Sequence, residues 1–217
     1  MGSAQGVIFD WDGVIADSLD QIHDVYQRTC RHFDGTLPVT TVEEFRGWYK
    51  ARWEQNFLEM GFSEKQLPMV LEHARSLVSY GEVRLFPEVV DFIQNLAPVY
   101  RLGIASTTDT VHIRGRLEQA GLLHLFPVVV GGEEGGSDKI KRYGDALHLM
   151  EVDASRSVAV GDTALDIRCA RHWGMQTVGV TYGWNVEVLV KAATPDRLVH
   201  HPREVEPAVR ALLDRAT

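Results

Sequence analysis

The chain has 217 residues, 45% hydrophobic and 24% charged, with a formal net charge of −8. This size suits one domain, or a core domain with a smaller inserted one, and the composition is that of a soluble globular protein. The negative charge disfavours general binding to nucleic acid or anionic membrane. Cys30 and Cys169 form neither a zinc pattern nor a disulfide framework. Without a secretory signal or a membrane-spanning apolar run, we expect a cytoplasmic protein.

Short apolar runs that end in polar residues or glycine recur along the chain, which is typical of buried parallel strands. The first is Gly6–Phe9, closed by Asp10-Trp11-Asp12-Gly13. Later runs alternate with helical patterns, which predicts right-handed crossovers and a parallel sheet. Strands are expected at 99–105, 126–130, 157–160, 177–180 and near 198–199, with helices at 88–96, 111–120, 139–150 and 164–173.

The segment from Ser18 to about Gly81 interrupts this alternation, because it carries helical patterns and no convincing strand. Its helices are expected at 19–32, 42–60 and 64–79. We therefore predict an α/β fold with a doubly wound, Rossmann-like parallel-sheet core and an inserted small α-helical cap. The predicted core comprises residues 1–16 and 82–217, and the predicted cap residues 17–81.

Acidic side chains follow two of the predicted strands, at the sheet edge where doubly wound folds bind ligands. Asp10 and Asp12 follow the first strand, and Asp162 and Asp166 follow the strand at 157–160. Carboxylates gathered there would repel one another and raise each other's pKa, a conflict that a hard divalent cation resolves. Oxygen ligands without His or Cys favour magnesium. All four aspartates are candidate metal ligands, and Mg²⁺ is the expected cofactor.

Two further groups at this edge favour an anionic ligand. Ser106 and Thr107 follow the second strand and offer hydroxyl and backbone N–H groups at a helix start, which suits phosphate. Lys139 or Lys141 adds positive charge. Taken singly, such residues are more often helix caps or solvated lysines, so the combination carries the prediction.

Three motifs resemble those of the haloacid dehalogenase superfamily. FDWDGV at 9–14 is similar to its nucleophile motif, DxDG[TV]; IASTT at 104–108 resembles its second motif; and GDTALD at 161–166 resembles its acidic GDxxxD motif. Their order and spacing match along almost the whole chain. The helical insertion is similar to the cap of the phosphoglycolate phosphatase-like branch.

The resemblance implies roles for the first two aspartates. Asp10 would attack phosphorus and become a transient aspartyl phosphate, while Asp12 would protonate the leaving oxygen and then activate water. Dehalogenases and phosphonate-cleaving relatives lack an equivalent of Asp12, so both reactions are disfavoured. Transfer to a sugar, as in beta-phosphoglucomutase-type enzymes, stays open, and a catalytically silent binding protein ranks low because the acidic set is intact.

The resemblance also implies a ligand set. Magnesium would be held by the Asp10 carboxylate, the Asp12 backbone carbonyl and Asp162, with Asp166 in support. Ser106 and the backbone of Thr107 would hold the transferring phosphoryl group. Many relatives carry a Lys-Pro pair for the active-site lysine, whereas DKIKRY at 138–143 has no proline. We favour Lys139, with Lys141 as its competitor.

The cap segment from Arg46 to Trp53 is the candidate for recognising the leaving group of the substrate, because Arg46 and Lys50 could bind a carboxylate or second phosphate. The alternative is an amphipathic helix with a solvated face. Trp11 is expected to pack away from the crevice. The predicted function is magnesium-dependent hydrolysis of a small phosphate monoester, phosphoglycolate-like or a sugar phosphate, by a phosphoric monoester hydrolase that is a monomer or homodimer.

Overall fold

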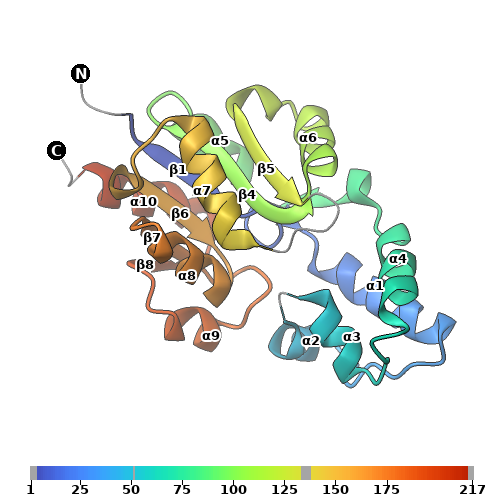
Figure 1. Ribbon diagram of the computed structural model, residues 1–217. Helices are drawn as coiled ribbons and strands as arrows, with labels where there is room; N and C mark the ends of the chain where they lie inside the picture. The colour runs from blue at the N-terminus through green and yellow to red at the C-terminus, as the bar shows by residue number, and fades with distance from the viewer. Residues whose placement is uncertain (1–3, 51, 133–137, 215–217) are drawn as a thin grey trace.

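A six-stranded parallel sheet forms the centre of the computed structural model, which describes residues 4–50, 52–132 and 138–214 (Figure 1). The strand order is β5-β4-β1-β6-β7-β8, so the first strand lies in the middle with crossovers on either side. The strands are β1 Gly6–Phe9, β4 Arg101–Asp109, β5 Val128–Gly132, β6 Ser157–Gly161, β7 Gln176–Val180 and β8 Arg197–Val199. The predicted fold class is confirmed.

Strand β1 is buried on both faces because its side chains alternate between two apolar clusters. Val7 and Phe9 face one cluster, while Ile8 faces the other. Phe9 pairs with Ile104 of β4 and with Val160 of β6. Phe9, Ile104 and Val160 therefore lie at the same level, and the polar residues that follow them meet at one edge.

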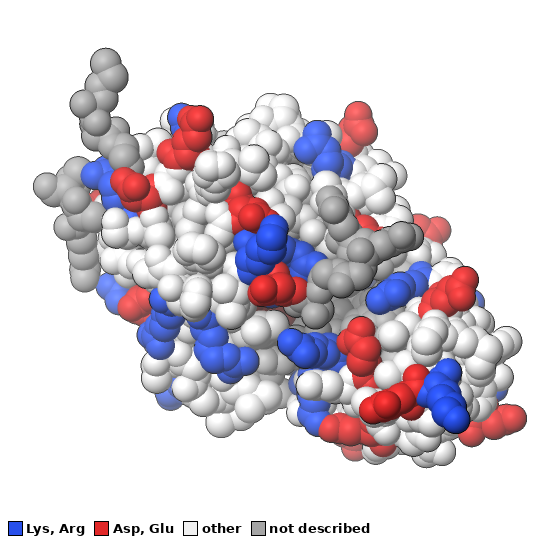
Figure 2. Space-filling model, in the orientation of Figure 1, with Lys and Arg blue, Asp and Glu red and all other residues white. Residues whose placement is uncertain are grey.

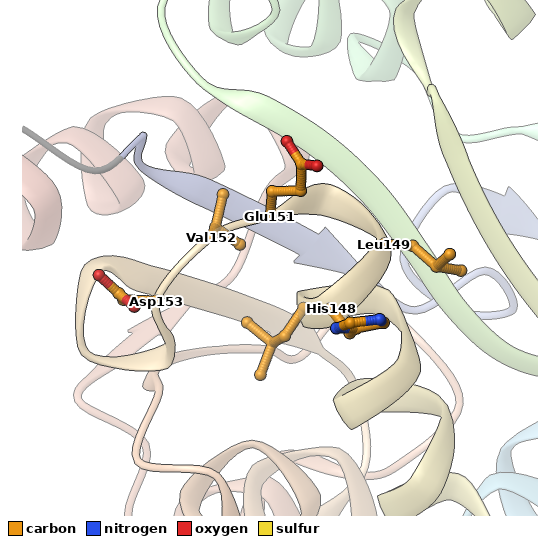
Figure 3. A pocket seen from close by; sticks show the side chains of 6 residues that line it. His148, Leu149, Glu151, Val152 and Asp153 are labelled. Atoms are coloured by element: carbon orange, nitrogen blue, oxygen red, sulfur yellow. The ribbon is translucent and has the colours of Figure 1, made fainter.

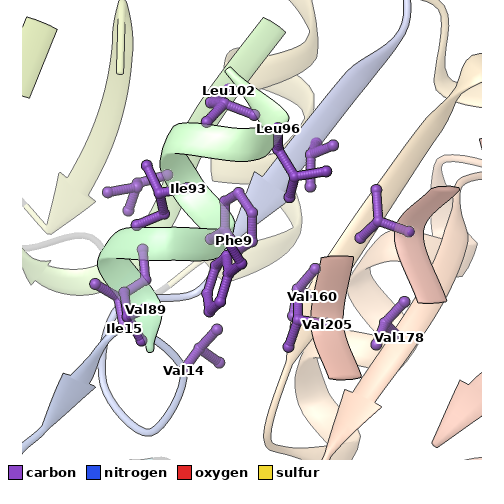
Figure 4. Close-up of a cluster of buried hydrophobic side chains, with 14 of the residues drawn as sticks. Phe9, Val14, Ile15, Val89, Ile93, Leu96, Leu102, Val160, Val178 and Val205 are labelled. Carbon is purple, nitrogen blue, oxygen red and sulfur yellow. The ribbon is translucent and has the colours of Figure 1, made fainter. Parts of the chain in front are cut away.

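Helices cover both faces of the sheet. The cluster that contains Phe9 includes side chains of α5, α6 and α10, as Figure 4 shows for α5 and its surroundings. Helices α7 and α8 cover the opposite face, with α9 beside α8. Their bounds are α5 Val89–Leu96, α6 Thr110–Gln119, α7 Lys139–Met150, α8 Ala164–His172, α9 Glu187–Ala192 and α10 Val205–Leu213, and short 3-10 turns occupy η2 Leu123–Leu125, η3 Ala154–Arg156 and η4 Pro202–Glu204.

The inserted segment forms a separate helical lobe (Figure 1). It contains α1 Leu19–His32, α2 Val42–Trp48, α3 Trp53–Glu59 and α4 Leu67–Ser76, followed by η1 Tyr80–Glu82. Its apolar cluster is its own, except that Trp184 joins it from the core. The two crossings between lobe and core pair antiparallel as β2 Ala16–Asp17 and β3 Arg84–Leu85. This supports the predicted division into core and cap, which we keep as a proposal.

One helical prediction in the cap is corrected by the structure. The pattern at 42–60 is two helices, α2 and α3, because Tyr49 adopts an extended backbone at the end of α2. The buried Asn56 side chain replaces the missing helical hydrogen bonds: its Oδ1 accepts from the Lys50 N–H at 3.0 Å and its Nδ2 donates to the Lys50 carbonyl at 2.8 Å. The same Nδ2 donates to the Tyr26 hydroxyl at 3.0 Å, which fixes the break against α1.

Charges of both signs are interspersed over the face shown in Figure 2. Cys30 and Cys169 are buried free thiols, one in the cap and one in the core. Among the described residues, no helix is both long enough and apolar enough to cross a membrane.

Candidate active site

The loop after β1 carries Asp10 into a buried position with 5% exposure. Its backbone N–H donates to the Val160 carbonyl at 2.9 Å, which continues the pairing of β1 with β6. Its Oδ1 accepts from the N–H of Trp11 at 2.8 Å. Trp11 itself is 2% exposed and packs in the core cluster, as expected for a side chain directed away from the site. The loop thus anchors the Asp10 carboxylate at the central strand end.

Two hydroxyl groups hold the side chain of Asp12. Its Oδ1 accepts from Ser18 Oγ at 2.6 Å, and its Oδ2 accepts from Thr108 Oγ1 at 2.5 Å. Ser18 lies at the start of the first cap helix and Thr108 at the end of β4, so both lobes orient this carboxylate. Burial raises the pKa of Asp12, and these two hydrogen bonds oppose that rise.

Asp10, Asp162 and Asp166 form a buried carboxylate cluster in which one carboxylate oxygen from each residue lies within 4.8 Å of the other two. Lys139 bridges two of its members: Nζ lies 2.6 Å from Asp10 Oδ2 and 2.6 Å from Asp166 Oδ1. Lys141 instead pairs with Asp145 on the surface, and its side chain is 71% exposed. The structure therefore brings Lys139 to the carboxylates, whereas Lys141 points to solvent.

The cluster contains three acidic side chains and one basic one. Burial and the neighbouring Asp166 raise the pKa of Asp10 to about 7, even though Lys139 opposes the shift. Burial raises the pKa of Asp162 well above its ordinary value, reinforced by Asp166 and Asp10. Burial alone would lower the pKa of Lys139, but the carboxylates outweigh it and raise that pKa. The site therefore has more acidic than basic groups, and all the acidic groups offer oxygen ligands, which suits a divalent cation.

An oxygen without a partner marks where such a cation fits. Asp162 is 1% exposed, and its Oδ1 has no hydrogen-bond partner among the described residues. Its Oδ2 accepts from the backbone N–H of Trp184 at 2.5 Å. A buried carboxylate oxygen left unpaired is costly unless a ligand satisfies it. The residues present could therefore hold a divalent cation through Asp162 and Asp10.

Asp166 is held by the start of α8 and also contacts Lys139. As a helix cap, its Oδ2 accepts from the Thr163 N–H at 3.0 Å and from Thr163 Oγ1 at 2.5 Å, closing a capping box at the start of α8. Its other oxygen accepts from the Tyr143 hydroxyl at 3.3 Å and contacts Lys139. The capped helix start thus fixes the carboxylate that holds the lysine.

Ser106 and Thr107 lie at the carboxyl end of β4, where the pairing with β5 shifts register. Ser106 is 1% exposed, and its Oγ accepts from the Thr108 N–H at 3.2 Å. Thr107 is exposed. The hydroxyl and amide groups of this bulge lie on the strand next to β1, beside the strand end that bears Asp10.

Arg46 and Lys50, the two cap residues predicted to bind substrate, contact groups outside the carboxylate cluster. Arg46 Nη2 donates to the backbone carbonyls of Thr181 at 2.9 Å and Asn185 at 3.4 Å, both in the core. Lys50 forms an ion pair with Glu59 inside the cap, with 46% of its side chain exposed. Among the described residues, no hydrogen bond or ion pair joins either cation to the carboxylate cluster. Their role in substrate binding stays a prediction.

Sequence reasoning assigned no role to several groups that contact the aspartates. Thr108 belongs to the IASTT segment, so its place in that segment was an available signal. The Ser18 and Tyr143 hydroxyls and the Trp184 N–H had none, because their contacts depend on how distant segments pack. Tyr49 of the cap also packs on Trp184, with ring centroids 4.7 Å apart.

A shallow depression at the carboxyl end of α7 lies away from this chemistry (Figure 3). It is lined by residues 147–149 and 151–153, including Glu151 and Asp153. Lys139 begins the same 12-residue helix, whose length is roughly 18 Å at 1.5 Å per residue. The depression therefore belongs to the other end of the helix from the carboxylate cluster.

Comparison with known proteins agrees with this geometry. The model of the haloacid dehalogenase-like hydrolase family matches residues 7–180. A phosphoglycolate phosphatase of Synechococcus elongatus is 28% identical, and the alignment covers 96% of this chain and 99% of the relative. A phosphoglycolate phosphatase of Escherichia coli O157:H7 is 31% identical, with 94% of this chain and 92% of the relative covered. A haloacid dehalogenase-like hydrolase structure from Streptococcus pneumoniae superposes with a TM-score of 0.85 at 26% identity, covering 96% and 99%. The chain therefore belongs to the haloacid dehalogenase-like hydrolase family and is an enzyme of the phosphatase class.

Proposed function

We propose that the chain is a magnesium-dependent phosphatase that hydrolyses a small phosphate monoester through an aspartyl phosphate on Asp10. One observation carries the proposal: a buried lysine bridges Asp10 to Asp166 at 2.6 Å each, while an oxygen of Asp162 beside them has no partner among the described residues. A structural ion pair would need one carboxylate for one ammonium. The surplus of buried acids is costly for folding and is better explained by catalysis.

In the first step, an Asp10 carboxylate oxygen forms a bond to phosphorus as the bond from phosphorus to the leaving oxygen breaks. Asp12, fixed by Ser18 and Thr108, gives its proton to that leaving oxygen. Lys139 holds Asp10 Oδ2 in place and contributes positive charge near the transferring group. The products are a free alcohol and the aspartyl phosphate.

In the second step, water attacks phosphorus of the aspartyl phosphate. Asp12, now ionised, takes a proton from that water, and the bond between phosphorus and the Asp10 oxygen breaks. Inorganic phosphate leaves, and both aspartates return to their starting states. The Ser106 hydroxyl and the Thr107 backbone would hold the phosphoryl oxygens in both steps.

Magnesium would be held by the carboxylates of Asp10 and Asp162 and the backbone carbonyl of Asp12, with Asp166 in support. When bound, it supplies positive charge that neutralises the phosphoryl oxygens. Mg²⁺ is preferred because the candidate donors are all oxygens and several waters can complete its octahedral shell.

The proposed substrate is a small phosphorylated metabolite of the phosphoglycolate or sugar phosphate type. Two matched relatives are named phosphoglycolate phosphatases. The test is phosphate release from a panel of such esters, with and without Mg²⁺, by the wild type, Asp10→Asn and the surface control Asp24→Asn. We expect magnesium-dependent release by wild type and control only. Release that survives Asp10→Asn, or no release from any ester, would contradict the proposal.

A further inference from the structure

The loop of residues 181–185 after β7 lies between the cap and the carboxylate cluster, and Arg46 of the cap binds both of its ends. The single nitrogen Nη2 donates to the Thr181 carbonyl at 2.9 Å and the Asn185 carbonyl at 3.4 Å. These partners are neutral backbone groups, and 20% of the Arg46 side chain is exposed. The other terminal nitrogen, Nη1, pairs with Glu43 of the same helix at 3.3 Å, while Nη2 joins the cap to the core.

An aromatic contact strengthens the same junction. Tyr49 of the cap packs edge-on against Trp184, with centroids 4.7 Å apart and planes at 77°. Trp184 is 6% exposed and is the one member of the cap's apolar cluster, among the described residues, that the core sequence contributes. Edge-to-face aromatic pairs are worth about 0.5–1.5 kcal/mol beyond the area they bury. The loop is therefore packed on the cap as well as hydrogen-bonded to it.

The other side of the loop contacts the candidate metal ligand. The Trp184 N–H donates to Asp162 Oδ2 at 2.5 Å. Gly183 lies so close that a Cβ there would come within 2.3 Å of the Gly13 carbonyl oxygen and 2.5 Å of Asp162 Oδ2. The Gly183 backbone therefore packs directly between the Gly13 carbonyl and the Asp162 side chain.

We propose that Arg46 is a positioning residue for the metal site. By fastening residues 181–185 to the cap, it keeps the Trp184 N–H on Asp162 Oδ2 and leaves Oδ1 for the cation. Docking of the cap thereby orders a ligand that the core itself supplies. The inference rests on the proposed role of Asp162 as a magnesium ligand.

The direction in which Mg²⁺ affinity changes when Arg46 is replaced distinguishes a positioning role from a purely electrostatic one. Arg46 is a cation, so its removal on electrostatic grounds alone would strengthen Mg²⁺ binding. Loss of positioning would weaken it instead. Partners that orient metal ligands typically contribute 10–100-fold to metal affinity, and Arg46 acts one contact further away. We expect Mg²⁺ to bind about 10-fold more weakly to Arg46→Met, at the lower end of that range.

The experiment is Mg²⁺ titration of the full chain by isothermal calorimetry, without substrate. Arg28→Met is the matched control, because Arg28 is a cap arginine paired with Asp24 on the surface. Its affinity should stay within about twofold of wild type, since exposed pairs contribute little. Asp162→Asn should lose the binding. Arg46→Gln replaces Arg46→Met if the latter lacks a native circular dichroism spectrum.

Unchanged or tighter Mg²⁺ binding by the Arg46 variants, together with loss in Asp162→Asn, would overturn this inference and leave the proposed function standing. Wild-type binding by Asp162→Asn would instead remove the metal site on which both depend. Weaker binding by the Arg46 variants alone, with Arg28→Met unaffected, would support the positioning role.

Discussion

Replacing Asp162 by asparagine is expected to stabilise the metal-free protein while removing its stabilisation by Mg²⁺. The native carboxylate is buried at 1% exposure, has one oxygen without a partner among the described residues, and lies near two further aspartates. Asparagine keeps a carbonyl oxygen to accept from the Trp184 N–H. Its amide can donate toward the neighbouring carboxylates, so a repulsive contact becomes an attractive one.

The size of the expected stabilisation follows from the Asp162 oxygen that has no partner among the described residues. Leaving a buried polar group unsatisfied costs about 1–3 kcal/mol, and more if it is charged. Relief of about 2 kcal/mol would raise the melting temperature of a chain of this size by roughly 4–8 °C. In the opposite direction, Mg²⁺ at 100 times its dissociation constant adds about 2.7 kcal/mol to the wild type and nothing to a variant that cannot bind it.

The assay is thermal unfolding with EDTA and with saturating Mg²⁺. Asp162→Asn should melt above the wild type in EDTA, and Mg²⁺ should raise only the wild-type transition. Asp24→Asn, a surface substitution of the same type, should match the wild type in both conditions. A variant that melts below the wild type in EDTA would refute the surplus-charge reasoning, and an equal Mg²⁺ shift in both proteins would refute the ligand assignment.

Three further predictions concern Lys139, with Lys141 as its control, Thr108 and Glu44. Lys139→Met should lower kcat/KM by about 10²–10³, the loss typical of a group that stabilises developing charge, whereas Lys141→Met should stay within about twofold, as steady-state kinetics would show. Thr108→Val removes one hydrogen bond to the Asp12 carboxylate and should lower kcat about 10-fold, since bonds to charged groups are worth about 1.5–3 kcal/mol; an unchanged kcat would contradict that role. Hydrogen bonds to the Glu44 carboxylate, chiefly from the Thr40 backbone and then from Thr41, lower its pKa from 4.5 to about 2. The stabilisation that ionised Glu44 gives the cap is therefore complete above pH 4.5 and is lost as the pH falls through 2. The difference in melting temperature between wild type and Glu44→Gln should shrink over that interval, and a constant difference would contradict it.

The core was predictable because its signals are local. Apolar runs such as Gly6–Phe9 end in acids at the sheet edge, and parallel pairing brings those ends together whatever lies between them. The structure accordingly gathers Asp10 with Asp162 and Asp166, which lie far from it along the chain. Strands β2 and β3 were not predicted, since two residues each are too few to form a pattern.

The choice between Lys139 and Lys141 needed three-dimensional information. Two residues apart on a helix differ by about 200° in direction, so only one of them can face the carboxylates. Local pattern marks the helix but not which side meets the sheet edge. Burial decides it, because the Lys139 side chain is 6% exposed and that of Lys141 is 71% exposed.

The contacts of the cap cations could not be predicted from sequence, again because they depend on three-dimensional packing. Arg46 and Lys50 lie at helical spacing, and Arg46 pairs with Glu43 three residues earlier. Their other partners are Thr181, Asn185 and Glu59, which no local pattern identifies. Two of these are backbone carbonyls, and a backbone carbonyl leaves no signature in the residue type. Contacts between lobes therefore had to be read from the fold.

The most direct test of the central claim is identification of the covalent intermediate. Wild-type enzyme, Mg²⁺ and a substrate found by the ester panel are mixed, quenched in acid within the first turnover and digested for mass spectrometry. We predict phosphate on the peptide that contains Asp10, and none in Asp10→Asn. Phosphate on another residue, or rapid turnover with no phosphorylated peptide at any quench time, would contradict the assignment of Asp10 as the nucleophile.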